Sequence, residues 1–216
     1  MTLAIGKLVR DFSELLKQIP DCPHKLYCLG NIDLLREKKI VAVVGSRKMS
    51  DYGKLMVEKL VVEAVKNDWV IVAGMALGVD AWVHQVCLDN KGKTIAVLAG
   101  GVERPRPAAN QQIYQSIIDG GGLVISEDRE GSVIDKNSFL RRNRIVAGLS
   151  LGVVVIEGER RSGTLNTAGW AGKFGREVMA IPGRIGDSLS EAPNWLIKNG
   201  AGLVENFSDV AEILGN

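Results

Sequence analysis

The 216-residue sequence predicts an α/β protein built on a mostly parallel, doubly wound sheet with helices on both faces. Short β-branched runs alternate along the chain with segments of helical length, an order typical of parallel sheets joined by crossover helices. Three of these runs, Ile40–Val44, Thr94–Leu98 and Val153–Ile156, are apolar almost throughout. Such runs indicate strands that are covered on both sides.

The expected elements follow one another without a repeat, a low-complexity tract or a linker. Residues 1–36 are expected to form an N-terminal extension with a helix near Phe12–Gln18, and residues 37–216 one core domain. The expected core strands are Ile40–Val44, Trp69–Ala73, Thr94–Leu98, Leu123–Ser126, Val153–Ile156 and Glu177–Ile181. The expected helices are Ser50–Asn67, Val79–Asp89, Gln111–Asp119, Arg142–Gly148, Thr164–Phe174, Glu191–Lys198 and Ser208–Leu214, the first and last capped by their serines.

The charge balance and the cysteines limit the kinds of function. Lys and Arg number 27 against 25 Asp and Glu, a formal charge of +2, so any nucleic-acid contact must be a local patch. Three cysteines without a C-x-x-C spacing argue against a disulfide framework and fit a reduced, cytoplasmic location. No apolar run approaches the roughly 20 residues that cross a bilayer, so we expect no membrane contact.

Glycine and basic residues gather where the predicted strands end. Ligands of open α/β sheets bind at the carboxyl ends of the strands, and three of these exits combine glycine with two basic residues. They are Gly45–Lys48, Gly100–Pro107 and Glu157–Thr164, and the basic segment Arg141–Arg144 lies just before the fifth strand. Backbone amides, helix N-termini and guanidinium groups all bind phosphate oxygens. We interpret the exits as an anion-binding rim.

Parts of this rim also have a purely structural interpretation. A helix cap alone explains Ser162-Gly163-Thr164. At about 100° per residue, Arg141 and Arg144 share one helix face whereas Arg142 points elsewhere. At least one of the three arginines is therefore expected to be solvated or to form a salt bridge.

Several catalytic signatures are absent. The sequence contains no G-x-x-x-x-G-K-[ST], no G-x-G-x-x-G after the second strand and no G-x-S-x-G, which disfavours P-loop, dinucleotide-dependent and α/β-hydrolase chemistry. Only His24 and His84 could serve a metal site or a triad. His84 lies four residues after Asp80, and we expect the two to form a structural hydrogen bond. We expect no catalytic residue, no metal and no cofactor.

A series of motifs between residues 20 and 201 carries a family resemblance. They are Ile40–Arg47, Gly74-x-Ala76-x-Gly78-x-Asp80-x-x-x-His84, Thr94–Leu98, Pro107-x-x-Asn110, Phe139-x-x-Arg142-Asn143-Arg144-Ile145-x-x-Gly148, Ser162-Gly163-Thr164-Leu165-x-Thr167-Ala168, Gly175–Gly183 and Asn194-x-Leu196-Ile197-x-x-Gly200-Ala201. One motif alone is a weak signal, but together and in this order they resemble the DprA/Smf family of DNA-processing proteins. Leu140 stands where many members have proline.

The resemblance implies an extended Rossmann-like fold and a positive pocket that binds single-stranded DNA for RecA-dependent recombination, in DNA uptake, transformation or DNA processing. It implies a RecA-type recombinase and a second copy of the chain as partners. It implies DNA contacts from the turn Gly45, Ser46, Arg47 and Lys48, from Phe139, Arg142, Asn143 and Arg144, and from Ser162, Gly163 and Thr164. Because few residues precede Ile40 or follow Ala201, we expect the Rossmann-like core alone, without the N-terminal helical domain or winged helix of many members.

The residues support this ligand class independently, because a nucleic-acid strand needs cations for its phosphates and a flat group, here Phe139, for a base. Two alternatives stay open. One is an enzyme resembling nucleoside-monophosphate phosphoribohydrolases, whose catalytic loop reads P-G-G-x-G-T-x-x-E. In the corresponding stretch, Glu159–Thr167, Thr167 replaces the glutamate that would transfer the proton. The other is a sensor that binds one small nucleotide in the same pocket.

Overall fold

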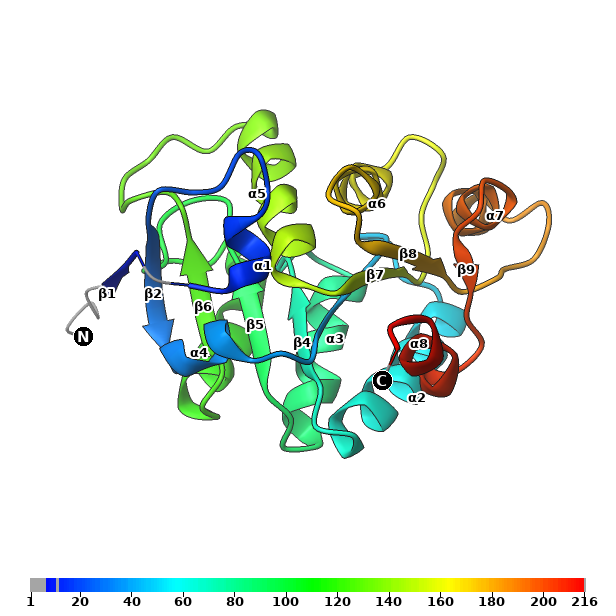
Figure 1. Ribbon diagram of the computed structural model, residues 1–216, viewed down its shortest axis with the longest axis horizontal. Helices are drawn as coiled ribbons and strands as arrows, with labels where there is room; N and C mark the ends of the chain where they lie inside the picture. Colours follow the sequence, from blue (N-terminus) through cyan, green and yellow to red (C-terminus); the bar gives the residue numbers. More distant parts are fainter. Residues whose placement is uncertain (1–6, 11, 216) are drawn as a thin grey trace.

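One sheet of nine strands organises residues 7–10 and 12–215, the part of the chain that this computed structural model describes (Figure 1). The strands lie in the order β1-β2-β6-β5-β4-β3-β7-β8-β9. Neighbouring strands are parallel, except that β2 runs antiparallel to both β1 and β6. The strands are β1 (Lys7–Val9), β2 (Leu26–Gly30), β3 (Ile40–Val44), β4 (Val70–Ala73), β5 (Thr94–Val97), β6 (Leu123–Ser126), β7 (Gly152–Val155), β8 (Glu177–Ala180) and β9 (Gly202–Leu203).

Helices cover both faces of this sheet, as the sequence predicts. They are α1 (Glu14–Lys17), α2 (Asp51–Lys66), α3 (Val79–Asp89), α4 (Gln111–Asp119), α5 (Lys136–Leu149), α6 (Gly163–Lys173), α7 (Glu191–Lys198) and α8 (Phe207–Ile213), with short 3-10 helices at Ile32–Arg36, Ala108–Asn110 and Ser188–Ser190. The core on one face includes side chains of α1, α5, α6 and α7, and the opposite face is covered by α2, α3, α4 and α8. Within the described residues, no helix is both long and apolar enough to span a membrane.

Strand β3 shows why the predicted strands are apolar at every position. Ile40, Ala42 and Val44 pack into the core beneath α5 and α6. Val41 and Val43 pack into the core beneath α2 and α3. All five side chains are buried, so the continuous apolar run reflects cover on both faces of the sheet.

The sequence predicts the cap of α2 correctly and the cap of the last helix, α8, incorrectly. Ser50 caps α2, because its hydroxyl accepts a hydrogen bond from the amide of Gly53 at 3.0 Å. The last helix is capped by Asn206 rather than by Ser208, since Asn206 Oδ1 accepts from the amide of Asp209 at 3.3 Å. The expectation that Ser208 caps this helix is wrong, because the helix already begins at Phe207.

Helix α5 begins at Lys136, before the Arg142 start that apolar spacing predicts. Asp135 and Ser138 cause this earlier start by forming a capping box. The Asp135 carboxylate accepts from the amide of Ser138 at 2.8 Å, and the Ser138 hydroxyl accepts from the amide of Asp135 at 3.3 Å. The extra turn places Phe139 on a helix.

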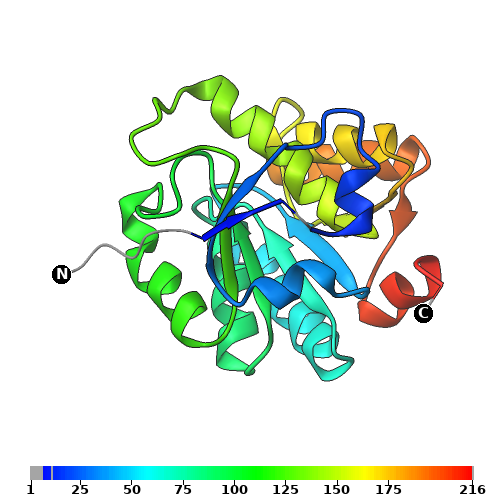
Figure 2. The same cartoon turned by 60° about the vertical axis from the view of Figure 1, so that its left-hand side comes forward.

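Three strands, β1, β2 and β9, lie outside the predicted set. Strand β2 pairs with β6 along its length and buries Leu26 and Cys28 in the core (Figures 1 and 2). Residues 7–10 and 12–36 thus contribute strands to the same sheet as the predicted core domain, whereas residues 1–6 and 11 of the predicted extension lie outside the described residues.

The order of strands reverses between β3 and β7. After β3 the chain adds β4, β5 and β6 on one side, and then returns to place β7, β8 and β9 on the other. The helices that follow β3 and β7 therefore leave the sheet toward opposite faces. In doubly wound sheets this reversal opens a crevice at the carboxyl ends of the two strands, where ligands bind.

His84 is a buried structural histidine, and its partner is not the one that the sequence suggests. The Thr94 hydroxyl donates to the carbonyl of Ile71 at 3.0 Å, so at 2.7 Å it accepts from Nδ1 of His84. Asp80 does not pair with His84, because its carboxylate accepts from the amides of Gly74 and Ala76 instead. Burial, with a smaller contribution from the charge of Arg142, lowers the pKa of His84 to about 3.

We expect His84→Gln to flatten the acid side of the stability profile. Between pH 6.5 and 3 the unfolded chain protonates this imidazole and the folded chain does not, so the free energy of unfolding falls as pH falls. Protonation of this one group in the unfolded chain should lower the free energy of unfolding by about 2 to 3 kcal/mol between pH 7.5 and 4.5. Urea unfolding at the two pH values measures it. His24→Gln, at an exposed histidine, should lose as much stability between the two pH values as wild type does. If His84→Gln also loses as much as wild type, His84 is not the group responsible.

Candidate functional site

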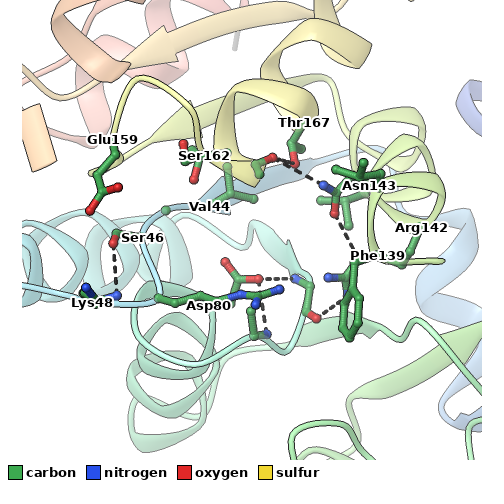
Figure 3. A pocket seen from close by; sticks show the side chains of 18 of the residues that line it. Val44, Ser46, Lys48, Asp80, Phe139, Arg142, Asn143, Glu159, Ser162 and Thr167 are labelled. Atoms are coloured by element: carbon green, nitrogen blue, oxygen red, sulfur yellow. Dashed lines mark hydrogen bonds between the residues drawn. The ribbon is translucent and has the colours of Figure 1, made fainter. Parts of the chain in front are cut away.

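A cavity of about 580 Å³ opens at the carboxyl ends of β3, β4 and β7, between α5 and α6 (Figure 3). Its position is the crevice that the strand order predicts. Its lining consists of Val44, Gly45, Ser46, Arg47, Lys48, Gly74, Ala76, Asp80, Lys136, Phe139, Leu140, Arg142, Asn143, Val146, Glu159, Ser162, Gly163, Thr164 and Thr167. The lining residues come from four separate segments of the chain, 44–48, 74–80, 136–146 and 159–167, so the fold brings them together.

The turn after β3 forms one wall of the cavity. The Ser46 hydroxyl accepts from the amide of Lys48 at 3.0 Å, and the Ser46 carbonyl accepts from the amide of Val79 at 3.0 Å. Gly78 precedes Val79 with a φ of 73°, and a Cβ there would collide with the carbonyl oxygens of Ser46 and Arg47. The glycine therefore lets the start of α3 approach and fix the turn.

Arg47 and Phe139 face each other across the cavity mouth. The guanidinium carbon of Arg47 lies 5.4 Å from the centre of the Phe139 ring, within the range of a cation–π contact. Arg47 and its neighbour Lys48 are exposed, whereas Phe139 is half-buried. Neither cation forms an ion pair with a carboxylate in the described part of the chain. The mouth thus presents free positive charge beside an aromatic ring.

Arg142 and Asp80 form the floor of the cavity. The Arg142 guanidinium donates to the carbonyls of Gly74 and Val97, and its Nε donates to Asn143 Oδ1 at 3.1 Å. Burial lowers the pKa of Arg142 to about 10, so it stays protonated at neutral pH. Burial also disfavours the charged form of Asp80 and so raises the pKa of this carboxyl. The charge of Arg142 and the hydrogen bonds from the Ala76 and Gly74 amides oppose this effect.

This floor is a buried network that shapes the site rather than a pair of free ligands. Arg142 is only 6% exposed and Asp80 is also 6% exposed. A Cβ on Gly74 would lie 2.7 Å from the guanidinium carbon, so the glycine gives Arg142 its space. Most of the donors of Arg142 are already used within the protein. Its charge contributes to the field of the pocket, and Asp80 offsets part of it.

The N-terminus of α6 forms the opposite wall. Ser162 precedes the helix without making a side-chain cap, and its Oγ is buried without a partner among the described residues. Asn143 Nδ2 donates to the Gly163 carbonyl at 3.3 Å and to Asn166 Oδ1 at 3.1 Å, which ties α5 to α6. Figure 3 shows Ser162 and Thr167 on the side of the cavity opposite Asp80. Free amides at a helix start, next to the Arg47 turn, can bind an anion.

Arg144 is the one predicted site residue that does not line this cavity. Its side chain is 3% exposed and forms salt bridges of 2.8 Å with Asp21 and with Glu127. Its helix neighbour Arg141 pairs with Asp128 at 2.7 Å. The helical period accounts for this, because Arg141 and Arg144 share a face that turns toward these carboxylates while Arg142 points to the sheet.

The remaining ten predicted site residues all line the cavity, as the lining given above shows. Lys136, Asp80 and Glu159 line it as well and were not predicted as site residues. Lys136 could have been found, because it lies three residues before Phe139, on the same face of a helix. Glu159 brings a carboxylate to the cavity, which no charge pattern in the sequence indicates.

The fold and this cavity define a Rossmann-like α/β protein with a cationic, aromatic pocket at the switch point of its sheet. Such a pocket suits a phosphate-bearing ligand with a flat ring. The chain belongs to the family of DNA recombination-mediator protein A, whose model matches residues 4–215. It is thus a DNA-processing protein of the recombination-mediator type, and the resemblance seen in the sequence is confirmed.

Relatives support this membership. The DNA processing protein DprA of Streptococcus pneumoniae is 46% identical over 195 residues, covering 90% of this chain and 68% of the relative. DprA of Bacillus subtilis is 38% identical, with 92% and 67% covered. Protein Smf of Escherichia coli is 40% identical, with 90% and 52% covered.

Solved structures show the same fold. DprA from Streptococcus pneumoniae superposes with a TM-score of 0.89 at 42% identity, over 97% of this chain and 75% of that one. DprA from Helicobacter pylori, solved in a study of its single-stranded DNA binding mode, gives 0.88 at 31% identity, over 96% and 94%. A molybdenum cofactor binding protein of Rippkaea orientalis gives 0.57 at 16% identity over 83% of this chain and 96% of that one, a likeness of fold alone.

Proposed function

We propose that this protein binds single-stranded DNA in the pocket between α5 and α6 and presents it for recombination in the cytoplasm. The observation that carries the proposal is the pair Arg47 and Phe139, a free guanidinium against an accessible ring at the mouth of the cavity. A base can stack on Phe139 while phosphates contact Arg47, Lys48 and the first amides of α6. The Helicobacter pylori relative, described by its single-stranded DNA binding mode, supports the same ligand.

Binding without catalysis fits the groups that line the pocket. Thr167 stands where phosphoribohydrolases carry their catalytic glutamate, and its hydroxyl points back to the carbonyl of Gly163 at 3.5 Å. Asp80 accepts hydrogen bonds from the amides of Gly74 and Ala76, and its charge interacts with that of Arg142. Glu159 is exposed and forms no ion pair among the described residues. We propose that the protein is not an enzyme.

Two partners are part of the proposal. A RecA-type recombinase would receive the bound DNA, and a second copy of this chain would form a homodimer. Exposed apolar side chains in the C-terminal third of the chain, Ile185 at 93% and Leu203 at 49% exposure, support a protein contact in that region. Sedimentation of the purified chain, alone and with a recombinase, tests both partners.

A salt titration tests the DNA-binding function. Three exposed cations, Arg47, Lys48 and Lys136, line the cavity, so log affinity for oligo-dT should fall against log salt with a slope of about −2. Single-stranded DNA should bind more tightly than a duplex of equal length, because paired bases cannot reach Phe139. A mononucleotide that binds as tightly as a 20-mer would favour the sensor alternative. Release of free base from a nucleotide would favour the enzyme.

Arg144→Gln is expected to leave affinity for oligo-dT unchanged while lowering the free energy of unfolding by about 2 kcal/mol. The reason is that Arg144 lies outside the cavity and pairs with Asp21 and Glu127. Fluorescence anisotropy with a labelled oligonucleotide and urea denaturation give the two measurements. A loss of affinity in a fully folded Arg144→Gln variant would show that Arg144 takes part in DNA binding.

A further inference from the structure

The loop between β7 and α6 separates two cation–aromatic pairs. On one side, Glu159 and Ser162 line the cavity that holds Arg47 and Phe139. On the other side, Arg160 extends over Trp195 of α7, with its guanidinium carbon 4.0 Å from the centre of the ring. Figure 1 shows this loop, in yellow, rising between α6 and α7, both of which pack beside β8.

The backbone holds this second pair in place. The Gly158 amide donates to the Leu189 carbonyl at 2.6 Å, and the Ala192 amide donates to the Gly158 carbonyl at 2.8 Å. The amide of Arg160 itself donates to Glu191 Oε2 at 3.1 Å. The loop is therefore fixed to the start of α7, and the position of Arg160 beside Trp195 does not depend on the cation–π contact alone.

Trp195 is more exposed than the other three tryptophans of the chain. Its side chain is 37% exposed, whereas Trp69 is 3% exposed and Trp82 and Trp170 are partly buried against the cores. Arg160 is exposed as well and forms no ion pair with a carboxylate among the described residues. A large aromatic ring at the surface, covered by a free guanidinium, is an arrangement on which nucleobases stack.

We propose that Arg160 and Trp195 form a second stacking position for single-stranded DNA, reached by a strand that leaves the pocket across the β7–α6 loop. This inference rests on the proposed function and extends it by naming a path. Arg160 directly follows Glu159, which lines the pocket, so a strand needs no further element to pass from one site to the other. The ligand is the next part of the same polynucleotide, held by a phosphate at Arg160 and a base on Trp195 or on the guanidinium plane.

The test compares a short with a long oligo-dT, of about 6 and about 20 nucleotides, within and beyond the site sizes of single-strand binders. Wild type should bind the longer one more tightly. Trp195→Ala should bind the short one normally and lose about 5- to 150-fold in affinity for the long one. Trp195→Phe, which retains a ring, should keep most of that affinity. Trp170→Phe is the matched control, since Trp170 also lies under a cation, Lys173, but packs against the core.

Tryptophan fluorescence supplies an independent readout. The long oligonucleotide should quench emission of wild type and of Trp170→Phe, and should quench Trp195→Phe much less. If Trp195→Ala binds each oligonucleotide as tightly as wild type does, and the quench is unchanged in Trp195→Phe, the second position is excluded. The exposed ring then fits a protein partner instead. If wild type binds neither oligonucleotide, the proposed function itself fails, which is a different result.

Discussion

Arg142→Met is expected to destabilise the fold by about 3 to 5 kcal/mol, the penalty typical of removing one of two buried opposite charges that interact electrostatically, here Arg142 and Asp80. Methionine fits the length of the side chain but leaves the Asp80 carboxylate without its cation. It also removes the donor for the carbonyls of Gly74 and Val97. Urea denaturation of wild type and variant at neutral pH measures the difference.

Two comparisons make this prediction specific. Arg141→Met, at a half-exposed arginine paired with Asp128, should cost at most about 1 kcal/mol. Adding Asp80→Asn to Arg142→Met should restore part of the lost stability, because no charge is then buried alone and the amides of Gly74 and Ala76 keep an acceptor. Equal losses in Arg141→Met and Arg142→Met would show that the network under the pocket is not buried as described.

The central strands and the pocket could be predicted because their signals are local. Ile40–Val44 is apolar at every position since it lies between two layers of helices. Its carboxyl end lies at the same edge of the sheet as that of β7, because parallel strands end at one edge. The sequence therefore predicts that the turn after β3 and the start of α6 lie at this edge, and the pairing of β3 with β7 makes them neighbours.

The parts that sequence reasoning missed depend on distant partners. Strand β2 is short, and its register is set by β6, far away in the chain. The helical period separates Arg142 from Arg144, but it does not say which of them faces the pocket. That choice depends on Asp21 and Glu127, which come from two other segments and pair with Arg144.

The largest functional effect is expected from Arg47 and Phe139 taken together. Phe139→Ala should weaken binding of oligo-dT by about 5- to 150-fold, the value of one stacked base. Arg47→Ala should lower affinity and also reduce the salt slope by about 0.7, because one phosphate loses its cation. Since the guanidinium lies against the ring, the two losses should not add, and the double variant should bind better than the product of the single effects predicts.

Lys48, the cation next to Arg47, allows the contribution of stacking to be distinguished from that of charge. Lys48→Ala removes an exposed positive charge from the same turn, so it should reduce the salt slope equally while its effect adds to that of Phe139→Ala. Arg47→Lys keeps the charge but loses the planar group. It should therefore show the salt slope of wild type, while its effect on affinity should add to that of Phe139→Ala. If Arg47 and Lys48 behave alike in every one of these pairs, the pocket binds phosphate by charge alone, and Phe139 is not a stacking surface for a base.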